Sequence, residues 1–176
     1  ALTRQRQLAR ASKTPGRTQL LNYFSLDEER RLVDLPGYGY AAVPMAIKLA
    51  WQKELENYLI KRESVQGLIL LMDMRHPLQQ YDEMMLNWAQ ERGLRVHILL
   101  TKCDKLNRGP SMTTLQEVKK QLLAKKLVAS IQLFSSLNKQ GLEDAAVVLG
   151  EWLNYPPAPI ELAHEIDITP PEVLSK

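Results

Sequence analysis

Two short segments of this sequence carry an aspartate where it could do specific chemistry. The first is Thr101 to Asp104 (TKCD), which directly follows the apolar run VHILL. An aspartate carboxylate can accept two parallel hydrogen bonds from N1–H and the 2-amino group of guanine, a donor pair that adenine lacks. The aliphatic stem of Lys102 could lie along the purine ring. Taken alone, the segment is also explained as a polar turn in which Asp104 caps a helix.

The second segment is Asp34-Leu35-Pro36-Gly37, at the end of the run RLVDL. A carboxylate at this point can hold Mg²⁺ through water, and a glycine lets a backbone N–H approach a terminal phosphate without a Cβ in the way. Taken alone, an Asp-x-Pro-Gly sequence is more simply a turn.

Two weaker candidates complete an ordered set. The backbone of Ser135-Ser136 could reach the guanine O6, and the hydroxyl of Thr18 could bind Mg²⁺. The interval from Asp34 to Asp104 holds two strand–helix alternations, and the interval from Asp104 to Ser135 holds one. Four weak signals in this order indicate a guanine-nucleotide site more strongly than any one of them.

The elements that must position these segments alternate along the chain. Apolar runs and turn residues predict strands at 18–26, 31–35, 65–72, 95–101 and 131–134, and helices at 44–63, 79–92, 111–127 and 140–153. The first two strands should form a hairpin. The rest predict parallel βαβ units, an α/β fold, with helices on both faces of the sheet. The runs LILLMD and VHILLT suit strands buried on both faces, and ligands bind such sheets at the carboxyl ends of their strands.

Composition sets the wider frame. The 176 residues, 45% hydrophobic and 24% charged, fit one globular domain at 1–154 and a proline-rich tail at 155–176 that we expect to be disordered. The longest apolar run, LILLM, is too short to cross a bilayer, so no membrane partner is expected. The single cysteine, Cys103, excludes an internal disulfide and fits a reducing compartment, by default the cytoplasm.

The net charge of +3 is unevenly distributed. The first 26 residues hold five basic side chains and no acidic one. Such an arm could contact the phosphates of a nucleic acid, or it could be a solvated helix and loop.

The sequence resembles the EngB family of bacterial GTPases, also called YihA or YsxC, which act in assembly of the large ribosomal subunit. The resemblance covers nearly the whole chain up to about Leu153. It is carried by the segments SKTPGRTQ (12–19), VDLPGYGYA (33–41), MDMRHPL (72–78), TKCDKL (101–106) and FSSLNKQG (134–141). It implies a P-loop NTPase-type GTPase domain with a mostly parallel sheet and helices on both faces.

The resemblance also implies roles for individual residues. Thr18 would bind Mg²⁺ from the first switch, and Asp34 would hold the same ion through water. The residues implied to bind GTP or GDP are Gly16, Arg17, Thr18, Gln19, Leu20, Asp34, Leu35, Pro36, Gly37, Thr101, Lys102, Cys103, Asp104, Phe134, Ser135 and Ser136.

Two departures from the GTPase pattern, the missing phosphate loop and Tyr38, change what is expected. No G-x-x-x-x-G-K-[ST] loop occurs in the sequence, which begins without methionine. We therefore expect a GTPase domain that is N-terminally incomplete here, with the phosphate loop directly upstream of Ala1. Thr101 stands where asparagine is more usual among GTPases; it is a shorter donor, which the EngB family accepts. Tyr38 follows Gly37, where many GTPases place the glutamine that orients the attacking water, so intrinsic hydrolysis should be slow and the catalytic residue is unknown.

The sequence therefore predicts a monomeric, Mg²⁺-dependent GTP-binding switch. Its activity would be hydrolysis of GTP to GDP and phosphate, weak without an activator. Its partner would be ribosomal RNA or a precursor of the large ribosomal subunit, with a link to cell division, septation and growth. Two alternatives remain: a non-catalytic RNA-binding module on a GTPase scaffold, and a GTPase that regulates a protein partner.

Two other residue choices are of less consequence. Arg75 and His76 suggest a structural turn with Pro77, one that could contact RNA, rather than an acid–base pair, because the sequence offers no evident titratable partner. Cys103 fits a small buried residue about as well as a redox-sensitive one.

Overall fold

A computed structural model describes residues 21–35 and 45–155 of the chain. These residues fall into two compact units, one holding 56–155 and the other holding 21–35 and 45–55. Each unit is described by itself.

The smaller unit contains the predicted hairpin. Strands β1 (Asn22–Ser25) and β2 (Arg31–Asp34) pair antiparallel, with Asn22 opposite Asp34. Asp27 organises the turn: its Oδ1 accepts hydrogen bonds from the backbone N–H groups of Glu29 and Arg30, at 2.9 and 2.7 Å. The Arg30 guanidinium bonds the other carboxylate oxygen at 2.6 Å and lowers the pKa of Asp27. The hairpin is confirmed, although the strand begins at Asn22 within the described residues and 18–20 lie outside them.

The larger unit is built on a parallel sheet in the order β3-β4-β5, as predicted. Its strands are β3 (Gly67–Asp73), β4 (Arg95–Thr101) and β5 (Ser130–Leu133). The register places Asp73 opposite Thr101 and Leu100 opposite Leu133. The carboxyl ends of all three strands therefore lie along one edge.

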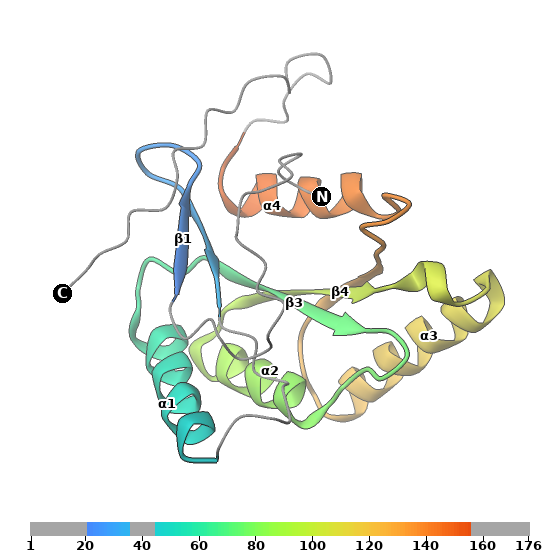
Figure 1. Cartoon of the computed structure of the whole chain (residues 1–176), viewed down its shortest axis with the longest axis horizontal. Coiled ribbons are helices and arrows are strands. Elements are labelled where there is room, and N and C mark those ends of the chain that lie inside the picture. The colour runs from blue at the N-terminus through green and yellow to red at the C-terminus, as the bar shows by residue number, and fades with distance from the viewer. Residues whose placement is uncertain (1–20, 36–44, 156–176) are drawn as a thin grey trace. The chain divides into compact units, whose positions relative to one another are not determined.

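Helices cover both faces of this sheet, which confirms the α/β prediction (Figure 1). The α-helices among the described residues are α1 (Met45–Lys61), α2 (Gln80–Arg92), α3 (Arg108–Ala124) and α4 (Leu142–Trp152). Helix α4 lies on one side of the sheet, and α2 and α3 lie on the other. On the α4 side, Leu99, Phe134 and Ala145 form one buried cluster.

The burial of the two long strands differs from what their composition predicts. In β4 every residue from Val96 to Leu100 is buried, as expected. In β3 the alternate residues Leu70 and Met72 are buried, but Leu71 between them is 59% exposed. The prediction of burial on both faces was wrong for β3, because Leu71 points to the opposite face from Leu70 and Met72 and is exposed there.

Local chemistry explains why two helices differ from their predicted bounds. Helix α3 begins three residues early because Pro110 lies in the first turn, where its missing N–H removes no helical hydrogen bond. It ends at Ala124 because Lys126 is left-handed (φ 56°) and the chain turns back, with Leu127 N–H bonding Leu122 O at 2.9 Å. Helix α4 begins at Leu142 because Gly141 is left-handed.

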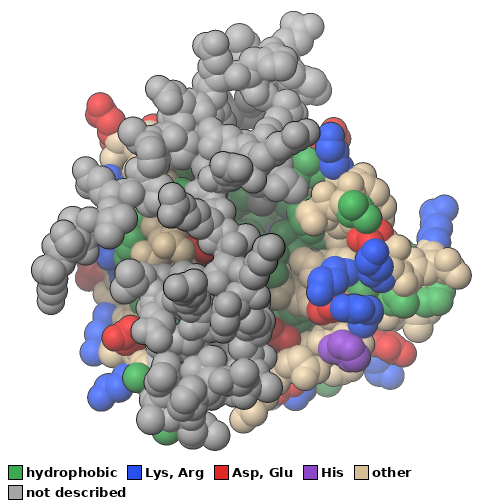
Figure 2. Space-filling view, viewed as in Figure 1, with side chains coloured by type: hydrophobic (Ala, Val, Ile, Leu, Met, Phe, Trp, Pro, Cys, Tyr) green, Lys and Arg blue, Asp and Glu red, His purple; other side chains and the backbone are tan. Residues whose placement is uncertain are grey.

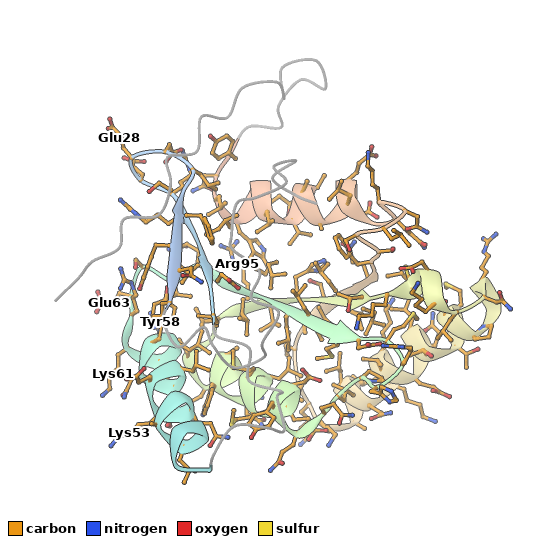
Figure 3. The ribbon with its side chains drawn as sticks, in the orientation of Figure 1. Glu28, Lys53, Tyr58, Lys61, Glu63 and Arg95 are labelled. Atoms are coloured by element: carbon orange, nitrogen blue, oxygen red, sulfur yellow. The ribbon has the colours of Figure 1, made fainter. Side chains whose placement is uncertain are left out.

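Arginines fasten helix ends within the larger unit. The Arg92 guanidinium donates to the carbonyls of Leu59, Ile60 and Arg62, at 3.1, 2.8 and 3.1 Å, where a cation stabilises the end of a helix. Arg95, labelled in Figure 3, lies 5.3 Å from the centre of the Trp152 ring. Arg92 thus joins α2 to the end of α1, and Arg95 joins the amino end of β4 to the end of α4.

Among the described residues, no helix is both long enough and apolar enough to cross a bilayer.

Candidate guanine-binding site

The candidate site is at the carboxyl ends of the parallel strands, where the sequence places it. Strand β4 ends at Thr101. Lys102 follows in the left-handed conformation, and a short 3₁₀ helix (Cys103–Lys105) contains Asp104. Strand β5 ends at Leu133 and is followed by Phe134, Ser135 and Ser136. Because the strands are parallel neighbours, both loops leave the sheet at the same edge.

A direct bond joins the two loops at Asp104. The hydroxyl of Ser135 donates to Asp104 Oδ1 at 2.5 Å, and Lys105 Nζ lies 3.3 Å from Oδ2. The Ser135 hydrogen bond, with help from Lys105, holds the pKa of Asp104 below its ordinary value. The carboxylate is therefore ionised at neutral pH. Each of its oxygens keeps acceptor capacity, since a carboxylate offers about four lone-pair sites.

Ser135 is the fully buried centre of the second loop. Its side chain has no exposed surface, and its Oγ also accepts hydrogen bonds from the backbone N–H groups of Leu137 and Asn138, at 3.2 and 3.4 Å. The Ser135 N–H donates to Gln140 O at 3.0 Å. One hydroxyl thus fixes both the turn and the carboxylate, whereas the neighbouring Ser136 is exposed.

Backbone bonds continue the connection between the loops. Phe134 N–H donates to Leu100 O at 2.8 Å, and Cys103 N–H donates to Phe134 O at 3.3 Å. Cys103 is buried, and its thiol lies 3.3 Å from Gln140 Oε1. Burial, followed by the nearby Asp104, raises the pKa of the thiol, so the thiolate that redox chemistry needs is disfavoured. This favours a packing role for Cys103.

Thr101 and Lys102 connect the site to β3. The Thr101 hydroxyl donates to Met72 O at 3.0 Å, which ties the ends of β3 and β4 together. Lys102 has φ 61° and ψ 30°, and its ammonium lies 3.0 Å from Asp73 Oδ2. A left-handed lysine is an uncommon conformation, because its Cβ crowds the following carbonyl.

Asp73 is a member of this cluster that the sequence-based prediction missed. Its Oδ1 accepts from the N–H and Nε of Arg75 at 3.0 and 2.9 Å, and its Oδ2 accepts from Nη2 at 2.6 Å. These hydrogen bonds, and less strongly the one from Lys102, hold the pKa of Asp73 far below its usual range. Arg75 therefore has a titratable partner, contrary to what the sequence suggested. The signal was available, because Asp73 is the last residue of an apolar strand, as Thr101 is.

The surface at this edge carries both signs of charge. Lys and Arg side chains gather beside acidic ones on the side toward which β3 points (Figures 1 and 2). The prediction that the RHPL segment is a structural turn agrees with the hydrogen bond from His76 N–H to Asp73 O at 2.9 Å.

The other predicted ligands belong to the smaller unit or lie outside the described residues. Asp34 ends β2, is exposed, and accepts a hydrogen bond from Asn22 Nδ2 at 3.4 Å; Leu35 follows it half-buried. The remaining predicted residues outside the described ranges are Gly16, Arg17, Thr18, Gln19, Leu20, Pro36 and Gly37.

An exposed carboxylate suits the chemistry that the resemblance implies for Asp34. Mg²⁺ keeps several waters and is bound through one or two protein oxygens together with substrate phosphates. Within 21–35 and 45–155 no group of three or more metal-ligating side chains occurs.

Comparisons with known proteins identify the family. Residues 1–102 match the family described as 50S ribosome-binding GTPase. The chain is 67% identical over 156 residues to "Probable GTP-binding protein EngB" of Acinetobacter baylyi, covering 88% of this chain and 66% of that protein. A protein of the same name from Acinetobacter baumannii is also 67% identical over 156 residues, with 88% of this chain and 74% of that protein covered.

A solved structure supports the fold. The crystal structure of a probable GTP-binding protein engB superposes with a TM-score of 0.63 at 15% identity, covering 84% of this chain and 87% of that one. The chain spans just under two thirds of the A. baylyi relative and about three quarters of the A. baumannii one. The α/β fold is that of a P-loop GTPase domain, and the chain belongs to the EngB family of GTP-binding proteins.

Proposed function

We propose that this chain binds GTP and GDP with Mg²⁺, reads the guanine base through Asp104, and acts as a slow GTPase switch. The observation that carries the proposal is the ionised Asp104 carboxylate, held by the buried hydroxyl of Ser135 at the carboxyl ends of parallel strands. A carboxylate fixed in this way is suited to accept the paired N–H donors of guanine.

Lys102 and the backbone after Phe134 would form the walls of the pocket around the base. The stem of Lys102 would lie along the ring, and the backbone that follows Phe134 would reach O6. Thr101 would serve by joining β4 to β3, because its hydroxyl is already used by Met72 O. Mg²⁺, when bound with the nucleotide, would neutralise phosphate charge, and Asp34 would hold it through water.

Base selectivity tests this proposal directly. We expect the full-length protein to bind a fluorescent GDP analogue that GTP and GDP displace. ATP should compete about a hundredfold less well or worse, because adenine offers no donor pair to Asp104 and leaves that carboxylate unpaired. Competition titrations with and without EDTA measure both selectivity and the contribution of Mg²⁺.

The control is the same titration after Glu117→Gln, which removes an exposed carboxylate from α3 without touching the strand ends. This variant should match the wild-type protein. Equal competition by ATP and GTP in the wild-type protein would contradict the assignment of Asp104 as the residue that reads guanine.

We also propose that the bound state controls association with precursors of the large ribosomal subunit in the cytoplasm, in a role linked to cell growth and division. The family description and the basic first 26 residues support an RNA-containing partner. GTP should strengthen co-sedimentation of the protein with these particles relative to GDP. Raising the salt concentration from 50 to 200 mM should weaken this binding at least tenfold, because counterions compete for RNA phosphates.

Single-turnover GTP hydrolysis should be slow for the protein alone and faster with the particles. The reason is that Tyr38, which follows Gly37, cannot orient the attacking water as a glutamine does.

The outcomes separate the alternatives. Equal particle binding in GTP and GDP, with no hydrolysis, would favour a non-catalytic RNA-binding module. Nucleotide-dependent behaviour without particle binding would favour a GTPase that regulates a protein partner.

A further inference from the structure

The carboxylate of Asp73 receives four hydrogen bonds from two basic residues. Three come from Arg75, and the fourth comes from the Lys102 ammonium at 3.0 Å, which belongs to a different strand end. The Asp73 side chain is 24% exposed, whereas those of Arg75 and Lys102 are 44% and 55% exposed. Asp73 is thus the least exposed of the three side chains, and both basic side chains bond to its carboxylate.

Lys102 needs such an anchor more than an ordinary surface lysine does. Its backbone is left-handed, which costs roughly 1–2 kcal/mol for a residue with a Cβ. Its long side chain would otherwise sample many rotamers, and ordering it costs up to about 2 kcal/mol. The ion pair with Asp73 holds the Lys102 ammonium and so restricts the direction in which the stem runs.

We propose that Asp73 is a positioning residue for guanine binding: it holds the Lys102 ammonium so that the aliphatic stem is preset to lie along the base. The inference rests on the proposed function. Arg75 contributes by keeping the carboxylate oriented, because its Nε and Nη2 bond both carboxylate oxygens in the planar arrangement that guanidinium favours. Asp73 itself does not touch the nucleotide in this arrangement.

A double-mutant cycle tests the coupling between Asp73 and Lys102. Asp73→Asn keeps the shape and removes the charge, and Lys102→Met keeps an unbranched apolar stem and removes the ammonium. We expect each variant to release fluorescent GDP about five- to tenfold faster than the wild-type protein, the effect of losing about 1 kcal/mol or slightly more at a partly exposed ion pair. The double variant should be no faster than Lys102→Met alone.

The matched control is Lys119→Met, which makes the same chemical change as Lys102→Met at an exposed position in α3. Its GDP release should stay within about twofold of wild type, because Lys119 is not part of the Asp73–Lys102 pair. Denaturant unfolding of each variant measures stability separately. A merely structural role would lower stability in Asp73→Asn and leave the release rate unchanged.

Each result has a defined meaning. Wild-type release rates in Asp73→Asn, or an additive loss in the double variant, would overturn the positioning role and leave the proposed function standing. Absence of GDP binding by the wild-type protein would overturn the proposed function and this inference with it. If Asp73→Asn does not fold, Lys102→Met carries the test alone, because an exposed lysine is dispensable for folding; an unchanged release rate in that variant would then refute the inference.

Discussion

Asp104→Asn is expected to lower the affinity for GDP about a hundredfold or more, because two charge-assisted hydrogen bonds to guanine are lost and each contributes about 1.5–3 kcal/mol. The same change should raise the affinity for xanthosine diphosphate. Xanthine carries a carbonyl in place of the 2-amino group, so an amide can donate to that oxygen while its own oxygen accepts from N1–H. The variant should therefore prefer xanthine over guanine nucleotides.

Displacement titrations with GDP and xanthosine diphosphate measure this change in preference. Asp144→Asn is the matched control, since it makes the same chemical change at an exposed position in the first turn of α4. It should bind both nucleotides as the wild-type protein does. Guanine preference that survives Asp104→Asn would show that another residue reads the base.

The second large effect is expected at Gly141, on the stability of the fold. Gly141 has φ 72°, and a Cβ added there would lie 2.2 Å from Leu133 O and 2.5 Å from Gln132 Nε2. The backbone carbonyl cannot move without shifting the end of β5, which leads directly into Phe134 and Ser135. Gly141→Ala should lower the free energy of unfolding by about 3 kcal/mol or more, combining left-handed strain with a backbone clash.

Gly93 provides a matched comparison for this prediction. It has the same φ of 72° at the end of α2, but a Cβ there would meet no atom within 4 Å. Gly93→Ala should therefore lose only about 1 kcal/mol, the cost of the left-handed conformation alone. Urea unfolding of the two variants isolates the clash from the strain. Equal losses would show that β5 yields to the added methyl group, and that the loop after it tolerates movement.

The helices and strands were predicted correctly where residues close together in the sequence determine them. The predicted strand at 95–101 matches β4 in full, because its apolar run is bounded by charged and polar residues. The hairpin was predictable for a similar reason, since Asp27 lies between two short strands and its side chain closes the turn. Helix ends were less predictable, because left-handed residues such as Lys126 and Gly141 depend on how the returning chain packs.

The site was predictable in its parts and less so in its connections. Asp104 and Ser135 were chosen from residue type, order and position after strands. Their hydrogen bond, which joins residues 31 apart in the sequence, required the parallel pairing of β4 with β5. Asp73 could have been chosen by its position at the end of an apolar strand, as Thr101 was, but its pairing with Arg75 depends on how the chain turns after β3. Guanine binding by the set stays a prediction.

The sequence by itself determined the α/β alternation, the order of the candidate segments and the family to which they belong, because these depend on residue types and spacing along the chain. Only the tertiary structure decided that Asp73 meets Lys102, since the register that sets Asp73 opposite Thr101 brings two strand ends together across 29 residues. Only the structure also showed that Leu71 is exposed, because burial depends on what packs against each face of the sheet. The local sequence pattern determines where helices and strands form, and the pairing of strands distant in the sequence determines which side chains lie close together.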